Sequence, residues 1–173
     1  MDIDNTLYPY QDSHNDAINA CYDLFKKQNI KELSKEAFRK LYRKKRNEVT
    51  ERLKPQGACR SRLFAFVSFF EDLSSPNAYL SALKFEEQYW ESFINSLDPS
   101  KEIINYLESC KNSGISICAV SDMQAHIQIK KLEKLNADKF IDFLVTSEEV
   151  GFEKPNKEIF ELSLKKMNLE KDQ

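Results

Sequence analysis

The chain has 173 residues, of which 41% are hydrophobic and 31% charged, with only 3 Gly and 5 Pro. This composition is typical of a helix-rich globular protein and excludes a disordered or fibrous chain, and the length suits a core domain with a modest insertion. The formal net charge of −2 gives no overall attraction to nucleic acid or to anionic membrane, so any anionic ligand requires a local site.

The four cysteines are widely spaced, without a CxxC pair or a histidine at metal-ligand spacing, and we expect reduced thiols. We read no signal peptide before the first motif, and no apolar run approaches the roughly 20 residues that cross a bilayer. We therefore expect a cytoplasmic protein with no membrane partner and no nucleic-acid partner. The sequence leaves the oligomeric state open.

Helical patterns dominate the first part of the chain. Residues 13–16 resemble a capping box and predict a helix start, and Ser34 is a plausible N-cap for a second helix that runs to about residue 54. Apolar residues at helical spacing predict two more helices over 60–73 and 78–97, separated by a Ser-Ser-Pro-Asn break. Together these segments predict an all-helical bundle.

The pattern changes after a predicted helix over 101–112 that stops at Gly114. The nearly uncharged run 115–120 is typical of a buried parallel strand, a helix follows over 124–135, and 140–145 supplies a second strand. Residues 115–145 therefore form a βαβ unit, and an amphipathic helix is expected over 156–168.

Several polar residues lie at the start of the chain or after the predicted strands, where the fold would bring them together. Asp2, Asp4 and Thr6 open the chain, Ser121 directly follows the first predicted strand, and Lys154 follows the second. Ligands of open α/β sheets bind beyond the carboxyl ends of the strands. We therefore expect these separate segments to converge on one crevice.

Three motifs in this order resemble those of the haloacid dehalogenase superfamily. They are Asp-Ile-Asp-Asn-Thr-Leu-Tyr at 2–8, Val-Ser-Asp at 120–122, and Gly-Phe-Glu-Lys-Pro at 151–155. The resemblance implies an α/β fold, with a Rossmann-like parallel-sheet core over 1–12 and 97–173 and an inserted all-helical cap over 13–96. It covers nearly the whole chain and implies a hydrolase of the helical-cap phosphatase branch.

The chemistry implied by the resemblance is phosphoryl transfer to a carboxylate. Asp2 is the expected nucleophile, because an acyl-phosphate that water later hydrolyses divides one difficult displacement into two steps. Asp4 is expected to protonate the leaving oxygen and then to deprotonate water, which requires a carboxyl pKa raised above its ordinary value. The expected substrate is a small phosphorylated metabolite, of the nucleotide or sugar phosphate class.

The resemblance also implies a Mg²⁺ cofactor, because a phosphomonoester beside two carboxylates is repulsive without a hard cation. Its implied ligands are the Asp2 carboxylate and the Asp4 backbone carbonyl. Ser121 and Asp122 are expected at the substrate phosphate, and Lys154 is expected to keep Asp2 ionised and to offset charge on the phosphoryl group. Arg60 and Arg62, which open a phenylalanine-rich helix, are candidates for substrate contacts from the cap.

Simpler readings exist for each motif taken alone. Asp2 to Thr6 could form only an Asx-type turn, Ser121 and Asp122 only a helix cap, and Lys154 only a loop end. His14 and His126 lack a second ligand at metal spacing, and we assign them no role. The cationic runs at 39–40 and 43–46 are interpreted as the solvated face of a long helix rather than a phosphate-binding or nucleic-acid-binding surface.

Departures from the family pattern qualify the expected activity. Only Met1 stands before Asp2, where family members have an apolar strand, and no acidic strand-end motif follows Lys154. Asp172 lies too close to the last helix to serve as that ligand. We expect a chain truncated at both ends, weak Mg²⁺ binding and little turnover from these 173 residues. The alternatives are a non-catalytic remnant or binding module of the same ancestry, a haloacid dehalogenase, and, with a less fitting layout, a phosphoacceptor receiver module.

Overall fold

A computed structural model of the protein describes residues 1–171, and the chain forms two compact units. The first, here called the α/β unit, comprises Met1–Tyr10, Lys54–Arg60 and Leu97–Gln173. The second, here called the helical unit, comprises Gln11–Leu53 and Ser61–Ser96. Asp172, considered above as a metal ligand, lies outside the described residues.

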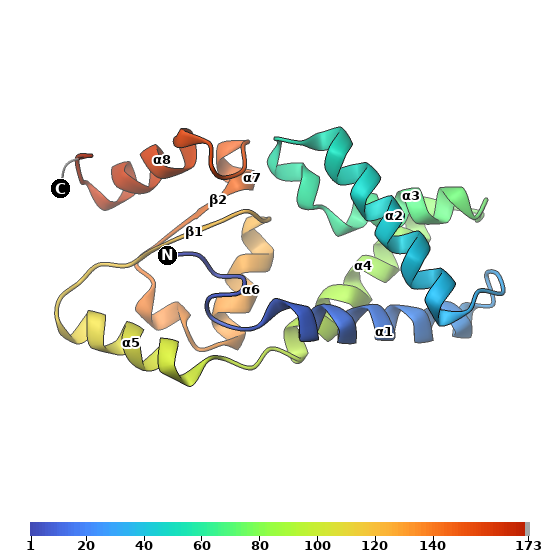
Figure 1. Cartoon of the computed structure of the whole chain (residues 1–173), viewed down its shortest axis with the longest axis horizontal. Helices are drawn as coiled ribbons and strands as arrows, with labels where there is room; N and C mark the ends of the chain where they lie inside the picture. The colour runs from blue at the N-terminus through green and yellow to red at the C-terminus, as the bar shows by residue number, and fades with distance from the viewer. Residues whose placement is uncertain (172–173) are drawn as a thin grey trace. The chain divides into compact units, whose positions relative to one another are not determined.

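The helical unit contains α1 (Tyr10–Gln28), α2 (Lys35–Leu53), α3 (Arg62–Asp72) and α4 (Ala78–Asn95) (Figure 1). The expected N-cap at Ser34 is present, because its hydroxyl accepts a hydrogen bond of 3.2 Å from the Ala37 backbone N–H. The capping box expected at Ser13 is wrong, since α1 already begins at Tyr10 and Ser13 is buried inside it. Asn5 accounts for the earlier start, because its side chain accepts a 3.1 Å bond from the Tyr10 N–H.

Aromatic rings fill the interior of the helical unit. Phe25 and Phe38 lie with ring centroids 5.3 Å apart, and Phe70 and Phe85 meet edge to face at 4.7 Å. Edge-to-face geometry places the positive edge of one ring on the negative face of the next and adds to the gain from burial. The fully buried rings are Phe25, Phe38, Phe66, Phe69, Phe70, Phe85, Tyr89 and Phe93. The phenylalanine-rich stripe of α3 is thus part of a packed core.

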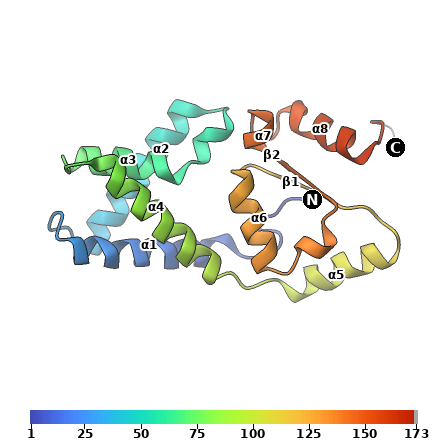
Figure 2. The same cartoon turned by 180° about the vertical axis from the view of Figure 1, so that it is seen from behind.

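The α/β unit has two parallel strands, β1 (Cys118–Ser121) and β2 (Phe143–Thr146), with Ala119 opposite Leu144. The helices of the unit are α5 (Lys101–Asn112), α6 (Ala125–Lys134), α7 (Ser147–Val150) and α8 (Lys157–Met167), with short 3-10 turns η1 (Gly57–Arg60) and η2 (Asp138–Phe140). In both views α8 lies on one side of the strands, and α5 and α6 lie on the other (Figure 1 and Figure 2). The expected helix-covered parallel pairing is present.

Both strands begin later than the sequence indicates. Ile115 is exposed and precedes β1, and Phe140, expected to open the second strand, is instead the last residue of η2. A small core explains where the strands begin, because Cys118, Val120 and Val145 are buried together with Ile159 of α8. An apolar run thus predicts that a strand is present, but packing of the strand residues against α8 determines where the strand begins.

The start of the chain lies along β1. The Met1 nitrogen donates a 2.7 Å bond to the Cys118 carbonyl, and the Val120 N–H donates a 2.8 Å bond to the Met1 carbonyl. This is the pattern of a parallel pair. The Ile117 carbonyl accepts from Phe143 near the start of β2, so Met1 and β2 lie on opposite edges of β1. Asp2 is thereby delivered beside the carboxyl end of β1.

Residues 54–60 join the α/β unit by backbone pairing. The Gly57 N–H donates to the Gly151 carbonyl at 3.1 Å, and the Glu153 N–H donates to the Pro55 carbonyl at 3.0 Å. A Cβ added to Gly57 would lie 2.4 Å from the Ser147 carbonyl oxygen, so only glycine fits this approach. The expected boundaries placed this segment in the cap, and the assignment of domains remains a prediction.

All four cysteines are free and buried. Between residues 1 and 171, no helix combines the length and the apolar character that a membrane span requires.

Candidate active site

Asp2 and Lys154 meet at the carboxyl end of β1. The Lys154 ammonium lies 2.9 Å from Asp2 Oδ2 and donates a 3.0 Å bond to the Val120 carbonyl. The Asp2 side chain is 45% exposed, whereas that of Lys154 is only 20% exposed. A fixed cation therefore stands beside a carboxylate that solvent and a ligand can reach.

Asp122 positions Lys154 from the backbone side. Its Oδ1 accepts a 2.8 Å bond from the Lys154 N–H. Burial raises the pKa of the Asp122 carboxyl above its ordinary value, and the Lys154 contacts offset part of that rise. The neighbouring Glu153 is buried and ion-paired with Arg60, whose Nη2 lies 3.3 Å from Glu153 Oε2. The loop that carries Lys154 is thus tied to β1 and to η1.

Asp4 lies in a second cluster, in contact with a buried lysine. Lys131 of α6 is fully buried, and its ammonium lies 2.6 Å from Asp4 Oδ1. The Tyr8 hydroxyl donates to the same oxygen, and Gln128 Nε2 lies 3.4 Å from Asp4 Oδ2. Three donors therefore converge on one carboxylate, and a buried cation beside a hydrogen-bonded carboxylate is a strong interaction.

The electrostatics of Asp4 differ from expectation. Burial alone would raise the pKa of this carboxyl, but the charge and hydrogen bond of Lys131, with the bonds from Tyr8 and Gln128, outweigh it and lower the pKa below its ordinary value. The expected raised pKa is therefore wrong for this arrangement. The Lys131 charge and these hydrogen bonds therefore favour the ionised form of Asp4.

Ser121 shares the Gln128 amide with the Asp4 cluster. It is buried at the end of β1, and its Oγ accepts a 2.5 Å bond from Gln128 Nε2. A hydroxyl that accepts one bond still carries its own proton, which it can donate to an anionic oxygen. The same amide thus reaches Ser121 and Asp4, so α6 sets the positions of both.

The residue types at Asp2 suit a hard cation, because carboxylate and carbonyl oxygens are the ligands that Mg²⁺ takes in proteins. Among residues 1–171, no group of three His, Cys, Asp or Glu side chains could hold a metal ion. The described chain therefore offers the Asp2 carboxylate and backbone oxygen such as that of Asp4. Magnesium commonly keeps several water and phosphate ligands, which makes such a small protein donor set compatible with it.

The two arginines considered for substrate contacts have different partners. Arg60 belongs to the α/β unit, where it pairs with Glu153. Arg62 is buried in the helical unit, with its guanidinium carbon 5.3 Å from the Tyr89 ring centroid and 5.8 Å from that of Trp90. The motif residues thus gather at the end of β1 within the α/β unit, and Arg62 does not lie in that unit.

Tyr8, Gln128 and Lys131 were not among the residues predicted to form the site. A signal for two of them exists in the sequence, because Gln128 and Lys131 lie three apart on the buried face of α6 that also carries Ile127 and Leu132. Polar residues within an apolar helical stripe need partners in the interior. The sequence cannot name that partner, since Asp4 is 127 residues away from Lys131.

Comparison with known proteins places these observations in a family. The profile of the family described as "Haloacid dehalogenase-like hydrolase" matches residues 1–173. The "Ribulose-1,5-bisphosphate 5-phosphatase" of Halopiger xanaduensis is 27% identical over 168 residues, which cover 97% of this chain and 70% of that protein. The "Glyceraldehyde 3-phosphate phosphatase" of Methanothermobacter thermautotrophicus is 39% identical over 71 residues, which cover 41% of this chain and 31% of that protein.

Solved structures share the fold. A 2-haloacid dehalogenase from Pseudomonas syringae pv. Tomato superposes with a TM-score of 0.76 at 17% identity, covering 97% of this chain and 71% of its own. A HAD-hydrolase of Bacillus subtilis bound to magnesium gives a TM-score of 0.66 at 19% identity, covering 95% of this chain and 70% of its own. These likenesses match the expected combination of a small parallel sheet with many helices.

Proposed function

This chain belongs to the family of haloacid dehalogenase-like hydrolases, and on that premise we propose that it acts as a Mg²⁺-dependent phosphatase on a small sugar phosphate. The observation that carries the proposal is the 2.9 Å contact between Lys154 and the exposed carboxylate of Asp2. The names of two curated relatives, each a phosphatase of a phosphorylated sugar, support the substrate class. The expected nucleotide phosphates are the other class to test.

Asp2 is the proposed nucleophile. One oxygen of its carboxylate attacks phosphorus, a bond from that oxygen to phosphorus forms, and the bond to the sugar oxygen breaks with its electron pair. Water then attacks the acyl-phosphate, which releases inorganic phosphate and restores Asp2. The Lys154 ammonium, 2.9 Å from Asp2 Oδ2, balances negative charge during transfer.

Asp4 is the proposed proton carrier for both steps. It gives a proton to the leaving sugar oxygen and takes one from the attacking water. The ionised state favoured by Lys131 suits the second step, because a carboxylate can accept that proton. The first step needs a protonated Asp4. The balance between these forms therefore depends on the Lys131 contact, which makes Lys131 the proposed positioning residue for Asp4.

The remaining groups would bind the phosphoryl oxygens. The Ser121 hydroxyl donates to one oxygen, and Lys154 and the segment at Asp122 stand beside it at the end of the same strand. Bound through Asp2 and the Asp4 carbonyl, Mg²⁺ would supply positive charge that offsets the repulsion between phosphate and carboxylates. Each of these contacts stabilises charge and forms no covalent bond.

The test is release of inorganic phosphate from a panel of sugar and nucleotide phosphates, with Mg²⁺ and with a chelator. Asp2→Asn should abolish release, and Asp4→Asn should lower it by about a hundredfold or more, the usual contribution of a positioned acid or base. The matched control is Asp138→Asn, which makes the same change at an exposed aspartate of η2. Equal activity of Asp2→Asn and Asp138→Asn would rule out the nucleophile, and release of halide from haloacids instead of phosphate would point to dehalogenation.

A further inference from the structure

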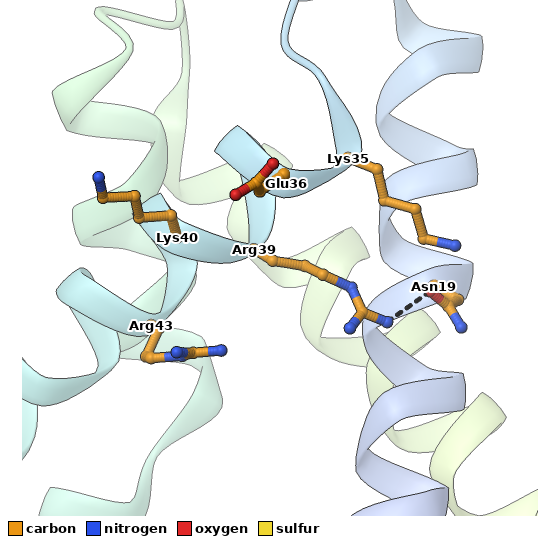
Figure 3. Close-up of a pocket in the computed structure, with 6 residues that line it drawn as sticks. All are labelled: Asn19, Lys35, Glu36, Arg39, Lys40 and Arg43. Carbon is orange, nitrogen blue, oxygen red and sulfur yellow. Dashed lines mark hydrogen bonds between the residues drawn. The ribbon is translucent and has the colours of Figure 1, made fainter.

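A pocket of about 790 Å³ on the helical unit is lined almost entirely by charged side chains. Four of the lining residues are cations and one is a carboxylate, so the pocket has an excess of positive charge. The lining residues are Asn19, Lys35, Glu36, Arg39, Lys40 and Arg43 (Figure 3). A concave surface with one sign of charge concentrates counter-ions of the opposite sign.

The spacing of the cations along α2 builds one side of this pocket. Lys35, Arg39 and Arg43 follow one another at intervals of four, which places them on the same face of the helix. Figure 3 shows their side chains extending toward the helix that carries Asn19, whereas Lys40 extends to the other side. Lys45 has another role, because it is bound to Asp72 at 2.5 Å. The cationic run is therefore more than a uniformly solvated face.

Arg39 is fixed in the pocket and has an unused donor. Its Nη2 donates a 2.7 Å bond to Asn19 Oδ1, which holds the guanidinium plane in place. Its Nε is enclosed and has no hydrogen-bond partner among the described residues. A buried N–H without an acceptor is uncommon and costly in a folded protein. The guanidinium also keeps its positive charge and further Nη donors, which suit the oxygens of an anion.

The positive potential extends beyond the pocket to His14 of α1. Burial lowers the pKa of His14, and the charges of Arg62, Arg39, Arg46 and Arg43 lower it further, to about 4. Two of these arginines, Arg39 and Arg43, line the pocket. The pKa of His14 therefore depends on the charge of the pocket although His14 does not line it, and this pKa can be used as a local probe of anion binding.

We propose that this pocket of the helical unit binds a phosphoryl group. A phosphoryl group supplies several acceptor oxygens for the cations that line the pocket, Arg39 and Arg43 with their guanidinium groups and Lys35 with its ammonium. A single small anion fits better than an extended polyanion such as nucleic acid, because the pocket is concave and the Glu36 carboxylate is among its lining residues. The ligand is either free phosphate or the phosphoryl group of a metabolite, and the two share this chemistry.

The test is a titration of the full protein with inorganic phosphate, followed by the imidazole resonances in NMR spectra. His126, which lies in the α/β unit, is the reference in the same spectrum. Bound phosphate should raise the pKa of His14 in a saturable manner. Arg39→Gln and Arg43→Gln should each weaken this response about tenfold or more, as expected for the loss of a charge-assisted bond. A parallel series with sugar monophosphates and bisphosphates separates the sources, since tighter binding of the sugars identifies a metabolite.

The matched control is Lys44→Gln, which removes one cation of the same helix outside the pocket, where Lys44 is 64% exposed. It should leave the response unchanged, and Lys154→Met should leave it unchanged as well, so that the result is independent of the proposed phosphatase activity. Arg43 is exposed, so its variant is informative even if Arg39→Gln impairs folding. The proposal would be overturned if phosphate caused no saturable change in the pKa of His14, or if Lys44→Gln weakened the response as much as the pocket variants do. It would also be overturned if only an oligonucleotide displaced the phosphate and Arg39→Gln had no effect.

Discussion

Replacement of Lys131 by methionine is the sharpest test of how Asp4 is held. The change removes the only charge of a fully buried side chain, keeps its approximate volume, and leaves the Asp4 carboxylate without its partner at 2.6 Å. Breaking a buried ion pair from one side typically costs about 3–5 kcal/mol. Because the Asp4 side chain is 25% exposed and keeps its bond from Tyr8, we expect the lower end, about 3 kcal/mol.

Urea denaturation at neutral pH measures this loss, and Lys130→Met, at the exposed neighbouring position, is the matched control. The double variant Lys131→Met with Asp4→Asn should recover part of the stability, because it leaves no unpaired charge. Carbon-13 NMR of the aspartates should show the pKa of Asp4 raised in Lys131→Met, since burial then acts with less opposition. A cost below about 1 kcal/mol, or a cost equal to that of Lys130→Met, would refute the described role of Lys131.

Two further predictions concern stability. Burial and the nearby arginines, Arg62 first, depress the pKa of His14 from 6.5 to about 4. Neutral His14 therefore contributes about 3 kcal/mol to the free energy of unfolding, fully present above pH 6.5 and lost as the pH falls through 4. Urea midpoints across that range should show this loss, and His14→Gln should remove it; an unchanged pH profile would contradict the described surroundings of His14. Gly57→Ala should cost about 1–3 kcal/mol, because its Cβ meets the Ser147 carbonyl. Thermal denaturation measures this cost, with Gly114→Ala as the control, because a Cβ at Gly114 meets open space and only the strain of its positive φ acts there. A smaller loss of stability in Gly57→Ala than in Gly114→Ala would count against the described packing of η1.

The sequence predicts those parts of the fold that depend on local patterns. The helices over α2 to α5 follow from apolar spacing and from caps such as Ser34, and the parallel strands follow from short uncharged runs. Ser121 could be placed at the end of β1 for the same reason, since the end of a buried run is visible in the chain. Lys154 instead follows α7, and only the folded chain brings it to the end of β1.

Features that depend on distant partners could not be predicted. The buried pair of Lys131 and Asp4 joins residues at opposite ends of the chain, and it reverses the direction of the expected pKa shift at Asp4. Residues 54–60 read as the end of a helix and a loop, yet backbone bonds to Gly151 and Glu153 pair them with the α/β unit. In both cases a local pattern permits several partners, and only the folded arrangement selects one.

Asp2 is the residue proposed to accept the phosphoryl group. The most direct measurement is intact-mass and peptide mass spectrometry of the protein, quenched in acid during a single turnover of a sugar phosphate with Mg²⁺. We expect one added phosphoryl group, located on the peptide that contains Asp2 and absent from Asp2→Asn, while Asp138→Asn is labelled like the wild type. A phosphoryl group on another residue, or labelling that persists in Asp2→Asn, would contradict it.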